Sequence, residues 1–406
     1  MIGLSILLGI ANGVLPSAAS AKELPAMPAS VTAISDGLAT FGVRLLVELS
    51  TRQPGHSVVV SPYGLATALA MTSQGAAGAT RSTLTDLLGL GEMASGQLAD
   101  GHQMLRDTLT TPGATGSVPT IANSLWAGQG MVFAESFLSQ QREAFGATFE
   151  TLHFEQPEAV KRINDWVATA TSGKISKIVE ELPATTPLVL VNAVHFKGAW
   201  QVPFAPADTK EQPFTLSDGS QRMVPLMIRR NASLAYQEMP DYQAVTLPYD
   251  GERFGLTVVL PTRNSEMPSA FLERTFNHLS VSPPNLLRPV TLSLPRLSLT
   301  FDAELRSALE VLGAGLVFTS SADFSAMTTT KVMLDRVLHA ASLIVDEYGT
   351  EVAAATAVMV GRSLVLRATV MTVDRPYYLL LHTLDEPRTL LFLAYIADPG
   401  PLAPGP

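Results

Sequence analysis

Two stretches of the chain carry apolar residues at helical spacing. In the first, residues 32–50, the apolar positions are Phe41, Val43, Leu45, Leu46 and Leu49. In the second, residues 157–175, one face carries Val160, Ile163, Trp166 and Val167. The first pattern predicts an opening helix, and the second predicts an amphipathic helix that ends at Gly173.

Beyond Pro187 the pattern changes to runs of β-branched and apolar residues bounded by Pro, Gly and Asp, which is typical of strands. The predicted strand regions are residues 187–204, 243–261 and 289–300, and a hairpin over 375–399 that turns at 385–387. Residues 303–315 predict one more helix with a glycine stop. Helices in the N-terminal half and strands in the C-terminal half indicate an α+β fold built on large, mostly antiparallel sheets.

The composition is that of a globular protein, with 47% hydrophobic and 16% charged residues. No linker-like stretch divides the chain, so we expect a single domain over residues 30–399 and a flexible tail over 400–406. The net charge of −9 argues against nucleic acid as a partner, because binding a phosphate backbone requires a basic surface. An excess of Arg over Lys and abundant Ala resemble the products of GC-rich bacterial genomes.

The N-terminus predicts export. An apolar stretch is followed by Pro16 and by small residues that end in Ala19, Ser20 and Ala21. This order is typical of a signal peptide over residues 1–21, and the alternative is a buried first helix. The apolar run is too short to span a bilayer. We therefore expect a secreted or periplasmic protein without a membrane partner.

The sequence contains none of several common catalytic or cofactor-binding motifs. The chain has no cysteine, so thiolate catalysis, disulfides and cysteine metal sites are excluded. It also lacks the G-x-S-x-G, H-E-x-x-H, P-loop and G-x-G-x-x-G patterns. The seven histidines are scattered along the chain. The sequence therefore predicts neither an enzyme nor a bound cofactor or metal, and a hydrolase assembled only in space is the remaining alternative.

Residues 346–369 fit no regular element. The run Ala353, Ala354, Ala355, Thr356 and Ala357 follows Gly349 and is too small to fill a core. Alanine favours helix, but large apolar residues at helical spacing are missing and β-branched residues follow. One interpretation is a small-residue linker or a helix.

Several segments together resemble the serpin family of protease inhibitors, in an order that spans nearly the whole domain. They are VVVSPYGLATALAMTSQGAAGATRSTL (58–84), NSLW (123–126), INDWVATATSGKI (163–175), LVLVNAVHFKGAWQVPF (188–204), LPYDG (247–251), LPRLSL (294–299), VLHAASLIVDEYGTEVAAAT (337–356), DRPYYLLL (374–381) and LFLAYIADP (391–399). The resemblance implies the serpin fold, with an exposed reactive-centre loop near the C-terminus.

The resemblance also implies a mechanism. A target serine protease, or as a second class a cysteine protease, cleaves the loop, and the freed segment inserts into the main sheet while the protease is still acyl-linked. The expected partner is thus a protease held in a covalent complex with a monomeric inhibitor. The alternative is a non-inhibitory serpin-fold binding protein or chaperone that is cleaved without trapping.

Residues 346–369 then become the hinge and reactive-centre loop. The hinge positions are Glu347, Gly349, Thr350, Glu351, Val352, Ala353, Ala354, Ala355 and Thr356. Gly349 would permit the unusual backbone angles of a swinging segment, and small residues suit a strand that must pass beneath a covering helix. Val352 and Tyr348 depart from the family pattern, so we expect inhibition with slower insertion.

Two further sites follow from the resemblance. Ser61, Asn192 and His339 match the central polar "shutter" that controls opening of the sheet, and the alternative is a set of satisfied core residues. Gly64 stands where serine is common, which predicts the loss of one polar partner. Trp200 matches the place where the loop enters the sheet, and its alternative is an ordinary core aromatic.

The reactive bond has two candidates. The usual family spacing from Gly349 gives Ser363 to Leu364, and a shift by one residue gives Arg362 to Ser363. Arg362 would fit the acidic specificity pocket of trypsin-like enzymes. Ser363 would suit elastase-like or subtilisin-like proteases, in which case Arg362 is a solvated loop charge.

Overall fold

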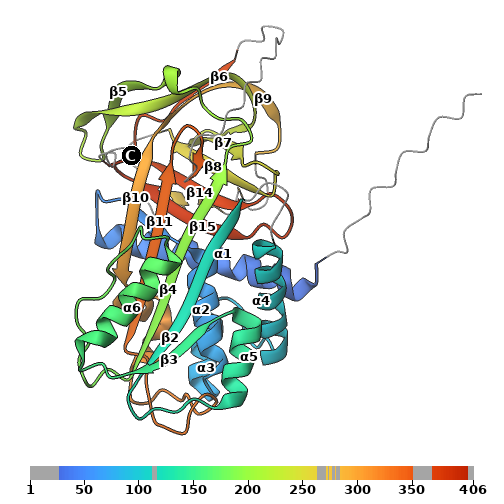
Figure 1. The fold of residues 1–406 in the computed structure, drawn as a ribbon. Helices are drawn as coiled ribbons and strands as arrows, with labels where there is room; N and C mark the ends of the chain where they lie inside the picture. Colours follow the sequence, from blue (N-terminus) through green and yellow to red (C-terminus); the bar gives the residue numbers. More distant parts are fainter. Residues whose placement is uncertain are drawn as a thin grey trace, which may run out of the picture.

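Two β-sheets and a group of helices form the molecule (Figure 1). The computed structural model describes residues 27–111, 117–262, 271–272, 274–276, 279, 284–350 and 368–400. The predicted signal peptide, the predicted hinge residues Glu351, Val352, Ala353, Ala354, Ala355 and Thr356, and the reactive-bond candidates Arg362, Ser363 and Leu364 lie outside these ranges.

The helices lie mainly in the first half of the chain, as predicted. They are α1 (Ala29–Arg52), α2 (Pro62–Gln74), α3 (Gly78–Leu87), α4 (Ser95–Thr110), α5 (Glu135–Phe145), α6 (Pro157–Ala170) and α8 (Arg306–Leu309). Among the described residues, α1 alone is long and apolar enough to cross a membrane, but most of it is buried against the fold. That burial is what a core helix requires.

The six-stranded sheet contains the regions that bear on function. Its order is β10 (Leu297–Glu304), β11 (Arg336–Val345), β4 (Leu188–Ala199), β2 (Val118–Gly128) and β3 (Thr148–Leu152), with the short β12 (Gly349–Thr350) paired to β4. Strands β11 and β4 are parallel from Arg336↔Val189 to Ser342↔His195. This parallel step in the middle of the sheet is flanked by antiparallel pairs with β10 and β2.

The nine-stranded sheet packs above the first. Its strands are β1 (Val58–Val60), β15 (Leu390–Ile396), β14 (Tyr377–Thr383), β8 (Phe254–Pro261), β7 (Tyr242–Pro248), β6 (Gln221–Glu238), β9 (Leu287–Pro295) and β13 (Thr369–Thr372), with β5 (Lys210–Thr215) paired to β6. All of these pairs are antiparallel except β13 with β9. The mostly antiparallel character agrees with the prediction.

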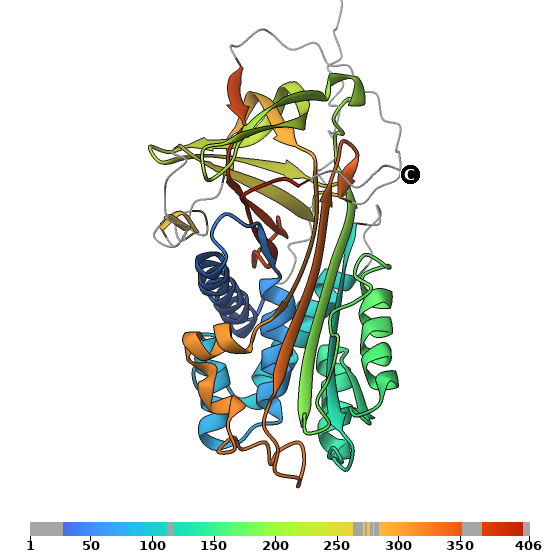
Figure 2. The same cartoon turned by 90° about the vertical axis from the view of Figure 1, so that its left-hand side faces the viewer.

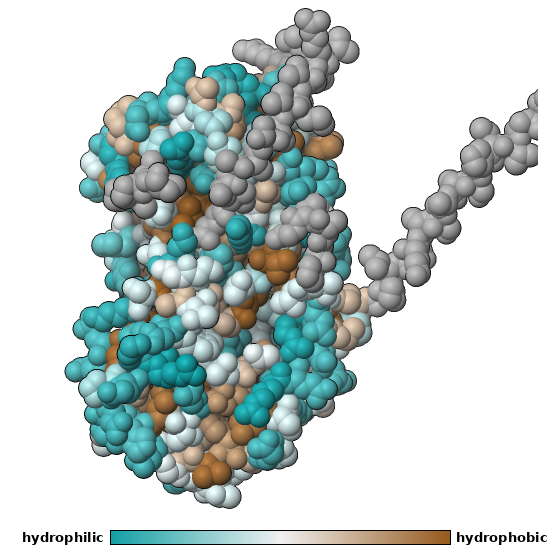
Figure 3. Space-filling view, viewed as in Figure 1, coloured by the Kyte–Doolittle hydropathy of each residue, from teal (hydrophilic) through white to brown (hydrophobic). Residues whose placement is uncertain are grey.

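The six-stranded sheet is covered on both faces. Figure 2 shows α6 on one face and the blue helices α1 and α2 on the other. The core between α6 and the sheet contains Trp126, Val189, Val191, Leu338 and Ala340. The outer surface on the α6 side mixes hydrophilic and apolar residues (Figure 3).

The prediction of one helix over residues 303–315 was wrong in extent. Only Arg306–Leu309 is α-helical, and wider and tighter turns follow in Glu310–Ala314 and Gly315–Phe318. Gly313 has a φ of 108°, which interrupts the regular helix. The regular α-helix therefore ends at Leu309, before the predicted glycine stop.

Candidate functional site

The predicted hinge begins inside the six-stranded sheet. After β11 the chain turns at Asp346, whose backbone N–H donates to the carbonyl of Gly349 at 2.9 Å. The Asp346 carboxylate accepts hydrogen bonds from the backbone N–H groups of Tyr348 and Gly349 at 2.8 and 3.1 Å. The reversed chain then pairs antiparallel with β4, through Gly349↔Ala199 and Thr350↔Gly198. Strand β12 thus lies at the end of the sheet where β11 and β4 no longer pair.

A glycine is required at position 349 because the backbone of β4 lies too close for a side chain. Its φ is +154°, and a Cβ there would lie 2.1 Å from the carbonyl oxygen of Gly198 and 2.8 Å from the Cα of Ala199. Both neighbours are backbone atoms, which cannot rotate away. The hinge can therefore pair with β4 only if residue 349 has no side chain.

The side chain of Thr350 is held in an aromatic cluster. Thr350 is fully buried, and its hydroxyl lies 2.6 Å from the phenol oxygen of Tyr249. The ring of Tyr249 stacks on Trp200, with centroids 4.5 Å apart and planes at 18°. Burial raises the pKa of Tyr249, so the phenol stays neutral. We call Trp200, Tyr249 and Thr350 the upper cluster.

Trp200 also binds the backbone of the turn before the hinge. Its backbone N–H donates to the carbonyl of Tyr348 at 2.9 Å, and its indole Nε1–H donates to the carbonyl of Asp346 at 2.9 Å. The resemblance places Trp200 where the loop would enter the sheet; in the structure it contacts the turn before β12, and its role in loop entry stays a prediction. The core-aromatic alternative also describes it in part, because the side chain is buried.

A buried ion pair fixes Glu347 beside the upper cluster. Glu347 is 2% exposed, and its carboxylate accepts from the Nε–H of Arg296 at 2.8 Å and from the hydroxyl of Thr209. Burial alone would raise its pKa, but the hydrogen bonds from Arg296 and Thr209 bring the pKa of Glu347 below its usual range. The glutamate is therefore ionised at neutral pH.

We expect Arg296→Met to lower the free energy of unfolding by about 3 kcal/mol, because it leaves the buried Glu347 carboxylate without its cation. Urea denaturation at pH 7 measures the loss. Arg296→Lys is the control, since it keeps the charge without the planar fork and should lose less. A methionine variant within 0.5 kcal/mol of the wild type would contradict this account of the pair, on the scale of about 0.5 kcal/mol expected for surface substitutions.

The three predicted shutter residues are brought together by the fold. The backbone N–H of Ser61 donates to Nε2 of His339 at 3.3 Å, and Nδ1 of His339 lies 2.9 Å from Oδ1 of Asn192. The Asn192 amide in turn donates to Oδ1 of Asn123 at 2.8 Å. Burial lowers the pKa of His339 to about 3, so the imidazole is neutral.

This central cluster (Ser61, Asn123, Asn192 and His339) joins α2, β2, β4 and β11. The hydroxyl of Ser61 accepts from the backbone N–H of Gly64 at 3.1 Å and donates to the carbonyl of Leu391 at 2.7 Å. The His339–Asn192 contact crosses between β11 and β4, the two parallel strands of the sheet. All four residues are buried and hydrogen-bonded, which also satisfies the core-residue alternative.

At Gly64, where the resemblance predicts the loss of one polar partner, close packing leaves no room for a side chain. A Cβ at residue 64 would lie 2.7 Å from Nδ2 of Asn192 and 2.7 Å from Cγ2 of Val194. The space that a serine side chain would use is therefore filled by residues of β4. In this chain glycine lets α2 approach the sheet more closely.

Sequence reasoning assigned no role to Tyr249, Arg296, Asp346 or Asn123. Each lies inside a segment that carries the family resemblance, but no local pattern distinguishes it there. Tyr249 and Thr350 are 101 positions apart in the chain. Only the fold brings them together.

Comparisons with known proteins agree with this geometry. A family model described as "Serpin (serine protease inhibitor)" matches residues 36–399. Neuroserpin of Gallus gallus is 30% identical over 402 residues, covering 95% of this chain and 94% of its own length. Serpin B9 of Homo sapiens is 32% identical over 339 residues, covering 80% and 89%.

Among solved structures, human thyroxine-binding globulin in complex with thyroxine is similar to this chain with a TM-score of 0.81 and 25% identity. The match covers 91% of this chain and all of that one. This similarity confirms the α+β fold predicted from the sequence.

Proposed function

The chain belongs to the serpin family, and on that premise we propose that it inhibits serine proteases as a suicide substrate, with cysteine proteases as a second target class. A protease cleaves the reactive-centre loop after Arg362 or after Ser363. While the acyl bond persists, residues after Gly349 insert between β4 and β11 and carry the protease with them. The nucleophile belongs to the protease, and this chain supplies the substrate and the change of fold.

The observation that supports this proposal best is the position of β12. Strand β12 already lies beside β4, with Thr350 fully buried, at the end where β11 separates from β4. Insertion would lengthen this strand and replace one parallel ladder with two antiparallel ones. At about 0.5–1.5 kcal/mol for each added hydrogen bond, a dozen bonds provide on the order of 10 kcal/mol.

The register of β12 determines which residues of an inserted loop would lie opposite each residue of β4. Continued along β4, it places Glu351 opposite Lys197 and Thr356 opposite Asn192. Ala353, Ala355 and Ala357 would then face α6, and Thr350, Val352, Ala354 and Thr356 would face the opposite side. The opposite charges of Glu351 and Lys197 favour this register. Small residues thus occupy the positions beneath the covering helix.

A second function is favoured by one neighbour. Thyroxine-binding globulin was solved with a bound small molecule, so a serpin fold that serves binding rather than inhibition is the alternative. In that case the loop would be cleaved without trapping a protease. We further propose that residues 1–21 are a signal peptide and that the mature, monomeric inhibitor acts outside the cytoplasm.

The test mixes the mature protein separately with trypsin, pancreatic elastase and subtilisin. We expect a complex that survives SDS with at least one of them, and a released C-terminal peptide that begins at Ser363 or Leu364. Mass spectrometry of that peptide fixes the reactive bond. The cleaved chain should melt tens of degrees higher than the intact chain, because the inserted strand adds hydrogen bonds and buried surface. Cleavage by all three proteases with neither a complex nor a rise in melting temperature would favour the binding protein.

A further inference from the structure

The α6 face of the six-stranded sheet is covered by two consecutive segments rather than by one helix. Helix α6 ends at Ala170, and the chain reverses at Gly173, which has a φ of +79°. The returning segment, residues 174–182, runs back along the helix and on toward β4. Its buried residues Ile175, Val179 and Leu182 belong to the same apolar cluster as α6. We call α6 and residues 171–182 the cover.

One side chain, Asn164, joins the two halves of the cover, and we call its three hydrogen bonds the clamp. The amide oxygen of Asn164, on α6, accepts hydrogen bonds from the backbone N–H groups of Ile178 at 2.8 Å and Val179 at 3.1 Å. The amide nitrogen of Asn164 donates to the carbonyl of Val179 at 2.9 Å. These bonds bind the returning segment to the helix from both sides of the amide group.

The cover lies across the line along which the sheet would open. It packs on Val189, Val191 and Ala193 of β4 and also on Leu338 and Ala340 of β11. A strand inserted between β4 and β11 separates these two sets of contacts. The cover must therefore release one of the two strands.

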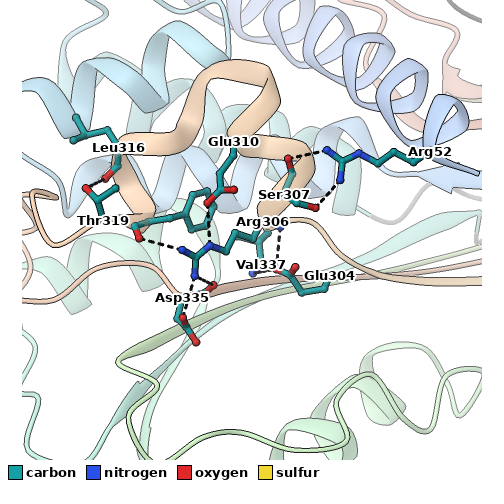
Figure 4. Close-up of polar contacts among 10 residues, drawn as sticks. Arg52, Glu304, Arg306, Ser307, Glu310, Leu316, Thr319, Asp335 and Val337 are labelled. Atoms are coloured by element: carbon teal, nitrogen blue, oxygen red, sulfur yellow. Dashed lines mark hydrogen bonds and ion pairs between the residues drawn. The ribbon is translucent and has the colours of Figure 1, made fainter.

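The chain connections decide which strand is released. The cover is joined through short connections to β3 on one side and β4 on the other, so it stays with that half of the sheet. The start of β11 is bound to the rest of the molecule instead. Figure 4 shows Arg306 of α8 hydrogen-bonded to Asp335, directly before β11, at 3.3 Å, and Glu304 accepting from the backbone of Val337 at 3.4 Å.

Helix α8 is in turn bound to α1. The guanidinium of Arg52 donates to the hydroxyl of Ser307 at 2.6 Å and to its carbonyl at 2.9 Å, as Figure 4 shows. Strand β11 is thus held to the helical body of the molecule, and the cover must leave Leu338 and Ala340 when the sheet opens.

We propose that Asn164 is a positioning residue that makes the cover leave β11 as one body and thereby limits the rate of loop insertion. With the clamp in place, the packing of α6 and of the returning segment on the sheet must be lost together. Without it, residues 174–182 can leave first and α6 afterwards, in two smaller steps. This inference rests on the proposed function, because it concerns the insertion step.

The test measures the rate of loop insertion. Excess subtilisin cuts the loop in a stopped-flow instrument, and tryptophan fluorescence records the insertion that follows. Trp166 lies on the cover and Trp126 beneath it, with ring centroids 6.1 Å apart, so both report its movement. We expect Asn164→Ala to insert about tenfold faster than the wild type, since three hydrogen bonds of the closed state are lost. Asn164→Asp keeps the acceptors for the Ile178 and Val179 N–H groups but loses the donor to the Val179 carbonyl, so its insertion rate should lie between those of the wild type and the alanine variant.

Ile34→Val is the matched control for stability. Ile34 is fully buried on α1, away from the cover, and the loss of one methyl group lowers stability without touching the clamp. Its insertion rate should equal that of the wild type. Equal acceleration in Ile34→Val and Asn164→Ala would overturn the inference, because general destabilisation would then explain the rate.

Different results would overturn the inhibitor function and the role of Asn164. A wild-type chain that is cleaved without any rise in melting temperature overturns the proposed function and this inference with it. A wild-type chain that inserts, together with an Asn164→Ala variant that inserts no faster, overturns the inference alone and leaves the inhibitor function in place.

Discussion

We expect Thr350→Arg to convert the proposed inhibitor into a substrate, with about 100-fold less SDS-stable complex for each loop cleaved. Thr350 is fully buried and bonded to Tyr249, within the ring stack of Trp200. A guanidinium in that space would replace the contact with the neutral phenol of Tyr249, and burying a charge without a matched partner costs several kcal/mol. Each 1.4 kcal/mol added to the insertion barrier slows insertion tenfold, while deacylation of the protease is unaffected.

Densitometry of SDS gels at several ratios of inhibitor to protease gives the fraction of cleaved molecules that trap the enzyme. Thr350→Ser is the matched control, because it keeps the hydroxyl that contacts Tyr249 and should trap nearly as well as the wild type. Thr350→Val keeps the shape of the side chain and loses only the bond to Tyr249. Its trapped fraction should therefore lie between those of the serine and arginine variants. An arginine variant that traps as efficiently as the wild type would show that β12 is not the start of the inserted strand.

The parts of the fold that could be predicted are those with a local periodic signal. Helix α1 buries Phe41, Leu45 and Leu49 on one side, and the pattern of these residues indicated the helix. The hairpin of β14 and β15 was predicted because two apolar runs flank residues 385–387. Each signal is contained in fewer than 30 residues, so it requires no knowledge of the rest of the chain.

Strand β6 was not predicted because its periodicity is irregular. Its partners change along its length, from β5 at one end to β7 at the other, with β9 on the opposite edge. The register with β9 shifts between Arg229 and Ala232, so the alternation of inward and outward residues is broken there. Twist and partner choice, which the sequence does not display locally, decide its burial.

Local patterns in the sequence identify even less of the candidate site than of the fold. Ser61, Asn192, His339 and Trp200 were named from the family resemblance, and no local pattern identified them. Strand β12 has only two residues, and its pairing depends on the absence of a side chain at Gly349 beside Gly198. The charges of Glu347 and Arg296 meet across 51 positions of the chain. Long-range contacts of this kind follow from the fold and cannot be read from neighbouring residues.

Acidification is expected to lower the free energy of unfolding by a large amount. Burial lowers the pKa of His102 and His339 to about 3 and that of His382 to about 4, whereas an unfolded histidine titrates near pH 6.5. The unfolded chain therefore binds more protons below pH 6.5, and stability falls as the pH drops from 6.5 toward the folded pKa values. At pH 4.5 the neutral burial of each histidine should have cost the fold about 2.7 kcal/mol of its free energy of unfolding, or about 8 kcal/mol for the three, which is comparable to the total stability of a domain.

Urea denaturation at pH 7.5, 5.5 and 4.5 measures this loss, and His339→Gln isolates the central cluster. Glutamine can still bond to Asn192 but does not titrate, so the variant should be less stable at pH 7.5 and lose about a third less stability on acidification. His56→Gln, on the exposed surface, is the control and should follow the wild-type curve. Protonation makes both ring nitrogens of His339 donors, so it removes the acceptor for the Ser61 N–H, whereas the contact with Asn192 Oδ1 between β11 and β4 is kept. A His339→Gln variant with the full wild-type acid loss would show that this histidine is not buried in its neutral form.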